Sequence, residues 1–342
     1  MDNRLTAIMV AAIVVVAVIA FVVGYYINKP EAPPAEEKIK IAFIFPGDVG
    51  DTSWNEAGYV AMNIFVGRHP DIEYTWIQGV YDPAQIRPQV EDYVTQGYNL
   101  IVGFGFQFEK PMYDVAQNLS EGQDVYFLVV AGPGSYKHPR LAVADVRTDQ
   151  TGYICGYIMM QLTQTGHVGF VAGMDVAELH RSWIGQRKGI QDAGYNPDEV
   201  YHVAFVGDFH DVTKSSLLTY ELIDTYGVDV LKTMGDGAQL GGIAAAKARH
   251  IKVLMSETYH PEIYPDGVVL YEIWHWEIAY EEWYQDYLAG RLGSETGHVY
   301  WLKLENNGIT LEKGAISGDL WNTVLDLESE IKAGQIDTGF TE

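Results

Sequence analysis

From Lys38 onward, short apolar runs alternate with amphipathic segments, and this alternation restricts the fold more than any other feature of the sequence. The apolar runs include IKIAFIF, NLIVGFG and DVYFLVVA, and residues with helical periodicity fill the segments between them. Continuous apolar strands joined by helical crossovers are typical of a parallel sheet that is covered on both faces. A second series of the same kind begins after DVRTDQTG. The sequence therefore predicts an α/β fold with two tandem, doubly wound parallel-sheet lobes.

The end of the chain departs from this simple alternation. The stretch VVLYEIWHWEIAYEEWYQDYLAG predicts a strand that runs into a long helix, and HVYWLKLENNGITL predicts a late β-hairpin. In doubly wound sheets, ligands bind beyond the carboxyl ends of the strands. Candidate functional residues are therefore those that directly follow a strand.

Composition excludes several classes of partner. The chain has 342 residues, a formal net charge of -24 and a pI near 4.6, whereas nucleic acids and anionic membrane surfaces require a basic face. Its single cysteine, Cys155, can form neither an internal disulfide nor a thiolate zinc cluster. Because Cys155 lies in an apolar helical pattern, we expect a buried, unreactive thiol. The ten histidines are scattered singly, so no metal site and no cofactor are expected.

The N-terminus carries an uncharged, mostly apolar run from Leu5 to Asn28, with Tyr25 and Tyr26 near its end. Such a run spans a hydrocarbon core of about 30 Å, and tyrosines are typical of the membrane interface. A cleaved signal peptide has a shorter apolar core and a small-residue cleavage site. We therefore interpret residues 1–28 as an uncleaved single-pass membrane anchor. The Pro- and Glu-rich segment 29–38 predicts an extended linker to a domain outside the cytoplasm.

The sequence FPGDVGDTSWNEAGY, residues 45–59, follows the first apolar run and contains the first candidate site residues. Asp48 and Asp51 lie in its turn, and Asp51 could cap the helix that follows. Trp54 needs another explanation, because a large ring in the first helical turn at the ligand-facing edge of a sheet requires something to cover it. Asn55 offers both a donor and an acceptor. We therefore expect this turn to cap a helix and to bind a small molecule.

Aromatic and acidic side chains follow other strands in the same way. After the third strand, GFGFQFEK contains Phe104 and Phe106, and strand alternation predicts that the two rings share one face. The strand ends of the second series add four further candidates, namely Phe209, Asp236, Glu257 and Trp274. Together these residues predict a cleft with flat stacking walls and a few hydrogen-bond acceptors.

From about Lys38 to its C-terminus, the chain resembles the basic membrane protein family of solute-binding proteins, which have the type I periplasmic binding protein fold and serve ABC importers for purine nucleosides. The most specific pieces are GDVGDTSWNEAGY, GFGFQFEKPMYDVA, GDFHDVTKSSLLTYELIDTYGVDVL and GGIAAAKARHIKVL. The resemblance implies an interlobe cleft and a hinge, with residues 39–147 plus about 272–303 in one lobe and residues 148–271 plus about 304–342 in the other. It also implies a monomer without enzymatic activity, a purine nucleoside or base as ligand, and an ABC permease as partner.

The resemblance extends to individual site residues. Four positions correspond to family residues around the base: Trp54 and Phe209, whose rings would enclose it, and Asp51 and Asn55. The aspartate that binds ribose in relatives corresponds to Glu257. The lysine that contacts ribose in relatives falls near Trp274, so this chain is more similar to a subgroup with tryptophans here, some of which look like binders of free purine bases.

Three alternatives remain open. The same fold and the same aromatic platforms also suit the pyranose rings of sugars. A ligand-sensing receptor domain has the same architecture and would require a cytoplasmic output module. A nucleoside hydrolase could use Asp51 and Glu257 as a carboxylate pair, although the sequence contains no Gly-x-Ser-x-Gly elbow, no His-Glu-x-x-His motif and no Walker loop.

Overall fold

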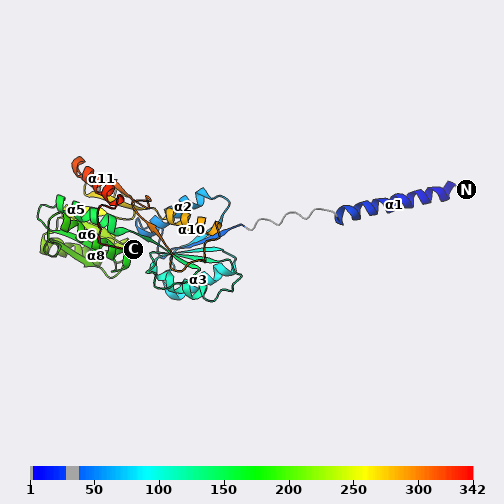
Figure 1. Ribbon diagram of the computed structural model, residues 1–342, viewed down its shortest axis with the longest axis horizontal. Coiled ribbons are helices and arrows are strands. Elements are labelled where there is room, and N and C mark those ends of the chain that lie inside the picture. The colour runs from blue at the N-terminus through cyan, green and yellow to red at the C-terminus, as the bar shows by residue number, and fades with distance from the viewer. Residues whose placement is uncertain (1–2, 28–37, 342) are drawn as a thin grey trace. The chain divides into compact units, whose positions relative to one another are not determined.

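The computed structural model of the protein describes residues 3–27 and 38–341, and the chain divides into two units at residue 38. The first unit is the helix α1 (Asn3–Ile27), drawn in blue in Figure 1. Its segment Ile8–Tyr25 is long and apolar enough to cross a membrane. A secretory signal sequence passes the same test. The predicted linker, apart from Lys38, lies outside the described residues.

The first lobe of the second unit is built on a six-stranded sheet in the order β11-β5-β4-β3-β1-β2, and every neighbouring pair is parallel. Its strands are β1 (Lys40–Ile44), β2 (Glu73–Ile77), β3 (Leu100–Phe104), β4 (Tyr126–Val130), β5 (Leu141–Val146) and β11 (Val299–Leu302). Its helices are α2 (Trp54–Arg68), α3 (Pro83–Thr95), the 3-10 turn η1 (Phe106–Phe108), α4 (Glu109–Ala116) and α10 (Trp276–Leu288). Side chains of β1 alternate between two cores, because Phe43 packs with α2 and α10 while Ile44 packs with α3 and α4.

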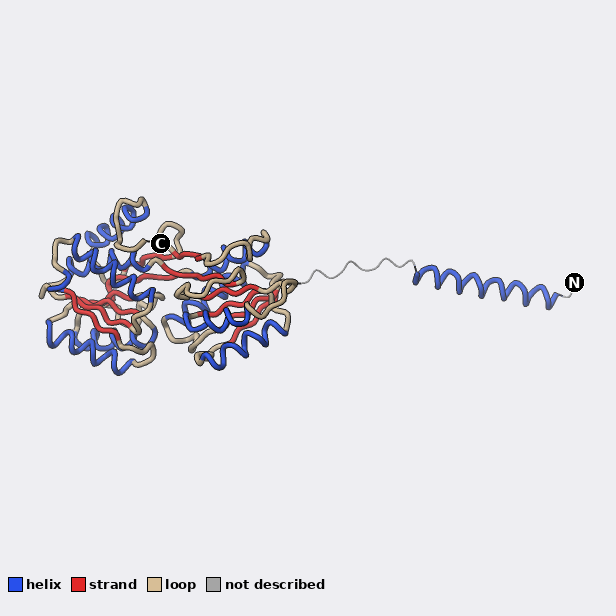
Figure 2. The backbone as a smooth tube through the Cα atoms, turned by 60° about the horizontal axis from the view of Figure 1, so that its bottom comes forward, coloured by secondary structure: helices blue, strands red, loops and turns tan. Residues whose placement is uncertain are grey.

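The second lobe repeats this plan with the order β12-β10-β9-β8-β6-β7, in which only the pair β10-β12 is antiparallel. Its strands are β6 (Val168–Ala172), β7 (Tyr201–Phe205), β8 (Val230–Met234), β9 (Lys252–Met255), β10 (Val268–Trp274) and β12 (Ile309–Lys313). Its helices are α5 (Thr148–Leu162), α6 (Ala177–Asp192), α7 (Pro197–Val200), α8 (Val212–Tyr226), α9 (Asp236–Arg249) and α11 (Gly318–Lys332). Figure 2 shows the two sheets in red, each between layers of helices. The predicted fold of two doubly wound lobes is confirmed.

The predicted late hairpin is wrong, because its two strands belong to different sheets. Strand β11 pairs with β5 in the first lobe, and β12 pairs with β10 in the second. The chain therefore passes between the lobes three times: between β5 and α5, between β10 and α10, and between β11 and β12. The last residues return to the first crossing, where Thr338 Oγ1 donates to Asp149 and the Phe340 ring lies over the guanidinium groups of Arg147 and Arg181.

Helices α5 and α6 cross at glycines that bring their backbones together. A Cβ atom added to Gly189 would lie 2.0 Å from the carbonyl oxygen of Tyr153, and one added to Gly156 would lie 2.1 Å from that of Gln186. Both of these carbonyl oxygens belong to the backbone, so they cannot move away by a change of rotamer as the end of a flexible side chain can. The apolar helix predicted around Cys155 thus packs at a distance that only glycine permits, and the thiol is buried as expected.

We expect Gly189→Ala to lower the free energy of unfolding by about 1–3 kcal/mol, because the added methyl group forces two packed helices apart. The matched control is Gly67→Ala in α2, where an added Cβ meets no atom within 4 Å; it should stabilise the protein by roughly 0.5–1 kcal/mol through helix propensity. Urea denaturation of the full chain measures both. Equal effects of the two substitutions would contradict the proposed contact.

Candidate ligand-binding site

A cavity lies between the two lobes, at the carboxyl ends of strands from both sheets. Its empty volume is about 480 Å³, which includes open space at its mouth. It is lined by Pro46, Trp54, Tyr81, Gly105, Phe106, Gln107, Ala131, Glu178, Leu179, Phe209, His210, Gly235, Asp236, Glu257 and Trp274. Six of the nine predicted site residues are in this set, namely Trp54, Phe106, Phe209, Asp236, Glu257 and Trp274.

The first lobe contributes Trp54 and Phe106 as aromatic walls. The Trp54 ring packs against Phe104 at 4.5 Å between ring centroids and meets the edge of Trp276 at 5.5 Å. Phe104 and Phe106 do not share a face as strand alternation predicted. Strand β3 ends at Phe104, which is fully buried, and Gly105 then adopts a φ of 147°, which turns Phe106 into the cavity. That backbone conformation is strongly disfavoured for any residue that has a side chain.

The second lobe contributes Phe209, which lies in the connection from β7 to α8. Two glycines seat its ring, since a Cβ added to Gly173 would lie 2.5 Å from Phe209 Cδ1 and one added to Gly235 would lie 3.2 Å from it. On the other side, the Phe209 and Phe106 ring centroids are 6.3 Å apart across the lobes. The two lobes thus present aromatic rings to one shared space.

The loop before α2 is held by Asp51. Its Oδ1 accepts hydrogen bonds from the backbone amides of Ser53 and Glu56, and its Oδ2 accepts from the backbone and side-chain nitrogens of Asn55. Asn55 is buried and its Oδ1 accepts from the Gly47 amide at 2.9 Å. Asp48 Oδ1 accepts from the Gly50 amide, and the Asp48 carbonyl oxygen accepts from the Asp51 amide. Within the described residues, Asp48, Asp51 and Asn55 therefore organise the turn that presents Trp54 and do not line the cavity.

Glu257 connects the two lobes. It is 1% exposed, its Oε1 accepts from the Gly235 amide at 3.1 Å, and its Oε2 accepts from the Ser53 hydroxyl of the first lobe. Beside it, Thr258 Oγ1 donates to the Thr52 carbonyl oxygen at 2.7 Å. These contacts hold the lobes closed around the cavity.

Backbone strain is concentrated at this site. Among the described residues, six that are not glycine have positive φ, and three of them line the cavity: Ala131 at 53°, Asp236 at 40° and Glu257 at 79°. Each such conformation costs on the order of 1–3 kcal/mol, and it persists where the surrounding structure imposes it. Such strain is typical of ligand-binding regions.

Sequence reasoning missed a third carboxyl group, Glu178, together with Tyr81. Glu178 lies in the first turn of α6, is 5% exposed and lines the cavity beside Leu179. Tyr81 follows β2 and meets the His210 ring edge-on across the lobes, at 5.5 Å between ring centroids. Both residues come shortly after a strand, so the rule that identified Trp54 and Phe209 could have found them.

Burial raises the pKa of each acidic group in the cavity. Desolvation is the main cause for Glu257, with a pKa raised to about 7, and for Glu178, with a pKa raised to about 8. The pKa of Asp236 is also raised, first by burial and then by the neighbouring charges of Glu257 and Asp51. Burial among the cavity walls therefore disfavours the ionised form of these carboxyl groups.

The ligand-free protein is expected to lose stability as the pH rises from about 5 to 8. A carboxyl group with a raised pKa in the folded state binds more protons there than in the unfolded chain, so its contribution is present at low pH and disappears as the pH passes the folded-state value. The melting temperature followed by intrinsic fluorescence measures this slope. Glu178→Gln should reduce the slope of the melting temperature against pH, and the exposed control Glu121→Gln should not. Identical slopes in the two variants would contradict the contribution of Glu178.

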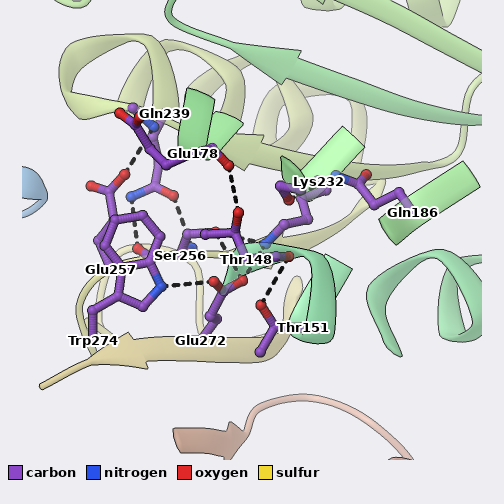
Figure 3. Close-up of polar contacts among 12 residues, drawn as sticks. Thr148, Thr151, Glu178, Gln186, Lys232, Gln239, Ser256, Glu257, Glu272 and Trp274 are labelled. Carbon is purple, nitrogen blue, oxygen red and sulfur yellow. Dashed lines mark hydrogen bonds and ion pairs between the residues drawn. The ribbon is translucent and has the colours of Figure 1, made fainter. Parts of the chain in front are cut away.

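Behind the cavity, Trp274 is held by a buried polar network (Figure 3). Its Nε1 donates to Glu272 Oε1 at 2.7 Å, and Glu272 Oε2 accepts from Lys232 Nζ at 2.8 Å. Lys232 also donates to Ser256 Oγ at 2.6 Å, and both Lys232 and Glu272 are fully buried. Burial would lower the pKa of Lys232, but the neighbouring Cys155 and Glu272 groups raise it above its usual value. The lysine therefore stays charged.

The two lobes, the three crossings and the closed aromatic cavity define the class of two-lobed solute-binding proteins. The chain belongs to the family described as ABC transporter substrate-binding protein PnrA-like, whose match covers residues 38–339. The resemblance to the basic membrane protein family is thereby confirmed. The protein is a substrate-binding component and not an enzyme.

Individual relatives are similar at low identity. A purine-binding protein from Brucella abortus is 25% identical over 93% of this chain and 87% of its own length. An ABC transporter nucleoside-binding protein from Lactococcus lactis is 21% identical over 72% of this chain and 69% of its own length. A solved ABC transporter solute-binding protein from Conexibacter woesei covers 87% of this chain and 98% of its own, with 23% identity and a TM-score of 0.68, which supports the fold.

Proposed function

We propose that this protein captures a purine base or nucleoside in the interlobe cavity and delivers it to an ABC importer. The observation that carries the proposal is the arrangement of Trp54 and Phe106 from one lobe and Phe209 from the other around a space edged by carboxyl groups. Base stacking on aromatic rings contributes roughly 1–3 kcal/mol per base, and carboxyl oxygens accept hydrogen bonds from the N–H groups at a base edge. The names of the Brucella and Lactococcus relatives agree with this ligand class.

Within this class, the structure favours a free base over a nucleoside. Both oxygens of Glu257, which corresponds to the family's ribose-binding aspartate, already accept hydrogen bonds from Ser53 and Gly235. Trp274 occupies the neighbourhood of the family's ribose-contacting lysine and lines the cavity with an apolar ring. The groups that would hold a sugar are thus engaged or absent from these positions in the closed form.

We also propose that helix α1 is a membrane anchor, which would place the binding unit outside the cytoplasm and beside its permease. Its length and apolar composition support this role. We further propose that the protein works as a monomer, with the lobes opening at the three crossings to admit the ligand.

The test is a thermal-shift series on the full chain in detergent micelles, with adenine, guanine, hypoxanthine, their ribosides, glucose, ribose and amino acids. A ligand at about 100 times its dissociation constant adds roughly 2.7 kcal/mol to stability, which is a clear shift. We expect a purine to give this shift. Phe209→Ala should weaken the binding of that purine by about 1–3 kcal/mol. The exposed aromatic Tyr195, replaced by alanine, is the control. A response to a sugar alone would overturn the proposal.

A further inference from the structure

A buried ion pair joins the two lobes at the first crossing. The carboxyl group of Asp145, in β5 of the first lobe, accepts from the guanidinium of Arg181, in α6 of the second. Both side chains are 7% exposed, and Arg181 Nε also donates to the Val146 carbonyl oxygen at 3.3 Å. Burial raises the pKa of Asp145 to about 6 and Arg181 counteracts this rise. The pair is therefore charged at neutral pH and links the lobes where the chain first passes between them.

The same guanidinium lies over two aromatic rings. Its Cζ atom is 5.2 Å from the ring centroid of Trp301, in β11 of the first lobe, and 5.4 Å from that of Phe340, which follows α11. The two ring centroids are 6.1 Å apart, and Arg147 Cζ lies 5.2 Å from the Phe340 centroid. A guanidinium is attracted to the negative face of an aromatic ring. Phe340 thus connects a cation of the crossing with a cation of α6.

The chain around Phe340 is fixed in this place by further contacts. Thr338 Oγ1 donates to the buried Asp149 carboxylate, which also accepts from Arg147 Nε and Nη2 at 2.8 Å each. A Cβ atom added to Gly339 would lie 3.1 Å from a side-chain atom of α6. Residues 338–340 are therefore held against both the first crossing and helix α6.

Helix α6 connects this cluster to the ligand cavity. Arg181 lies one helical turn beyond Glu178 and Leu179, which line the cavity. The carbonyl oxygen of Glu178 accepts from Thr148 Oγ1, at the start of α5 just after the crossing (Figure 3). The first turns of α6 are thus held by the crossing at two points. A change at this crossing therefore acts on one wall of the cavity.

We propose that Trp301, Arg181 and Phe340 form a hinge lock, which holds the two lobes closed in the absence of ligand. Asp145 and Trp301 belong to one lobe and Arg181 to the other, so rotation of the lobes disturbs their contacts, and these contacts favour the closed form. Phe340 is not among the described residues that line the cavity. It is a positioning residue that acts through Arg181. Its effect on ligand affinity rests on the proposed function, whereas its effect on lobe closure does not.

The test measures distances between two spin labels by pulsed electron paramagnetic resonance, on the full chain in detergent micelles without ligand. The labels are attached to Gln85→Cys in α3 and Thr213→Cys in α8, because these exposed positions closely follow Tyr81 and His210, whose rings meet across the lobes. The native cysteine is buried. We expect the parent to populate mainly a short distance. Phe340→Ala should raise the ratio of open to closed molecules roughly three- to tenfold, the size of one cation–π contact.

Two further variants make this result specific to the hinge lock. Phe340→Tyr keeps the aromatic face and should restore the parent distances. Tyr226→Ala removes a partly exposed ring of the second lobe that stacks on His202 at 4.1 Å between ring centroids, and it should leave the distances unchanged. A parent that is wholly open without ligand would overturn the hinge lock, and so would equal distances in Phe340→Ala and Tyr226→Ala. Melting temperatures show that each variant is folded.

Isothermal titration separates this inference from the proposed function. If a purine binds, its dissociation constant in Phe340→Ala should rise by the factor by which the closed fraction falls, because only that fraction is competent to hold the ligand. A constant that stays the same while the closed fraction falls would overturn the role of Phe340 in ligand binding. If no purine binds, the proposed function fails, and the spin-label distances still decide the hinge lock.

Discussion

Replacing Lys232 by methionine is expected to lower the free energy of unfolding by about 3–5 kcal/mol, since it leaves the Glu272 carboxylate buried without its cation. Both side chains are fully buried, and the Lys232 Nζ to Glu272 Oε2 distance is 2.8 Å. Removing one partner of such a pair costs far more than removing both, because the uncompensated charge must remain in a medium of low polarity. Urea denaturation of the full chain, followed by tryptophan fluorescence, measures the loss.

The double variant Lys232→Met, Glu272→Gln should recover most of this loss, because the glutamine keeps an acceptor for Trp274 Nε1 while removing the charge. The matched control is Lys40→Met, which breaks the partly exposed pair of Lys40 and Glu73 and should cost no more than about 1 kcal/mol. If Lys232→Met costs no more than Lys40→Met, the ion pair does not hold the second lobe as described.

Trp274→Ala is expected to cost about 3–5 kcal/mol in stability and also to weaken ligand binding. The stability loss follows from the large cavity left by a side chain that is 3% exposed and from the unpaired Glu272 oxygen. The binding loss, about 1–3 kcal/mol for the best purine, follows from the missing aromatic wall. Chemical denaturation and isothermal titration measure the two effects separately.

Two further variants separate the roles of Trp274. Trp274→Phe retains an aromatic wall but lacks the N–H donor, so it should lose about 1–3 kcal/mol of stability while keeping most of the affinity. Trp76→Ala removes a ring that is 37% exposed on the edge strand β2 and lies outside the cavity; its ligand affinity should not change. A normal affinity in Trp274→Ala would show that this ring is a support for the second sheet only.

The buried network gives Trp274 its place relative to the first lobe. Gln239 exchanges two hydrogen bonds with the backbone of Ser256, which accepts from Lys232, and Gln239 also donates to the Ser53 hydroxyl at 3.3 Å. Ser53 in turn donates to Glu257. The charged pair is thus connected through hydrogen bonds to the contact that closes the lobes, so substitutions at Lys232 should also change ligand affinity.

The local features of the sequence determined the fold class and the first wall of the site. Continuous apolar runs such as Phe127 to Val130 can be buried on both sides only in a covered parallel sheet. Asp51 and Trp54 lie three residues apart in sequence, at the start of the same helix, so their local arrangement could be predicted without knowledge of the fold. The strand-end rule then located Phe209, Asp236 and Glu257, because each one directly follows or closely follows a strand.

Only the tertiary structure decided which distant residues meet. Lys232 and Glu272 each lie within a buried strand, and their pairing depends on the order β10-β9-β8, which no local pattern specifies. By local rules, the late strands β11 and β12 could pair with each other. In the structure, β11 pairs with β5 in one sheet and β12 pairs with β10 in the other. Glu178 and Asp236 enter one cavity because the lobes close at the three crossings. Sequence patterns act over a few residues, whereas sheet order and lobe closure are set by the sum of packing over the whole chain, and these long-range contacts made the site.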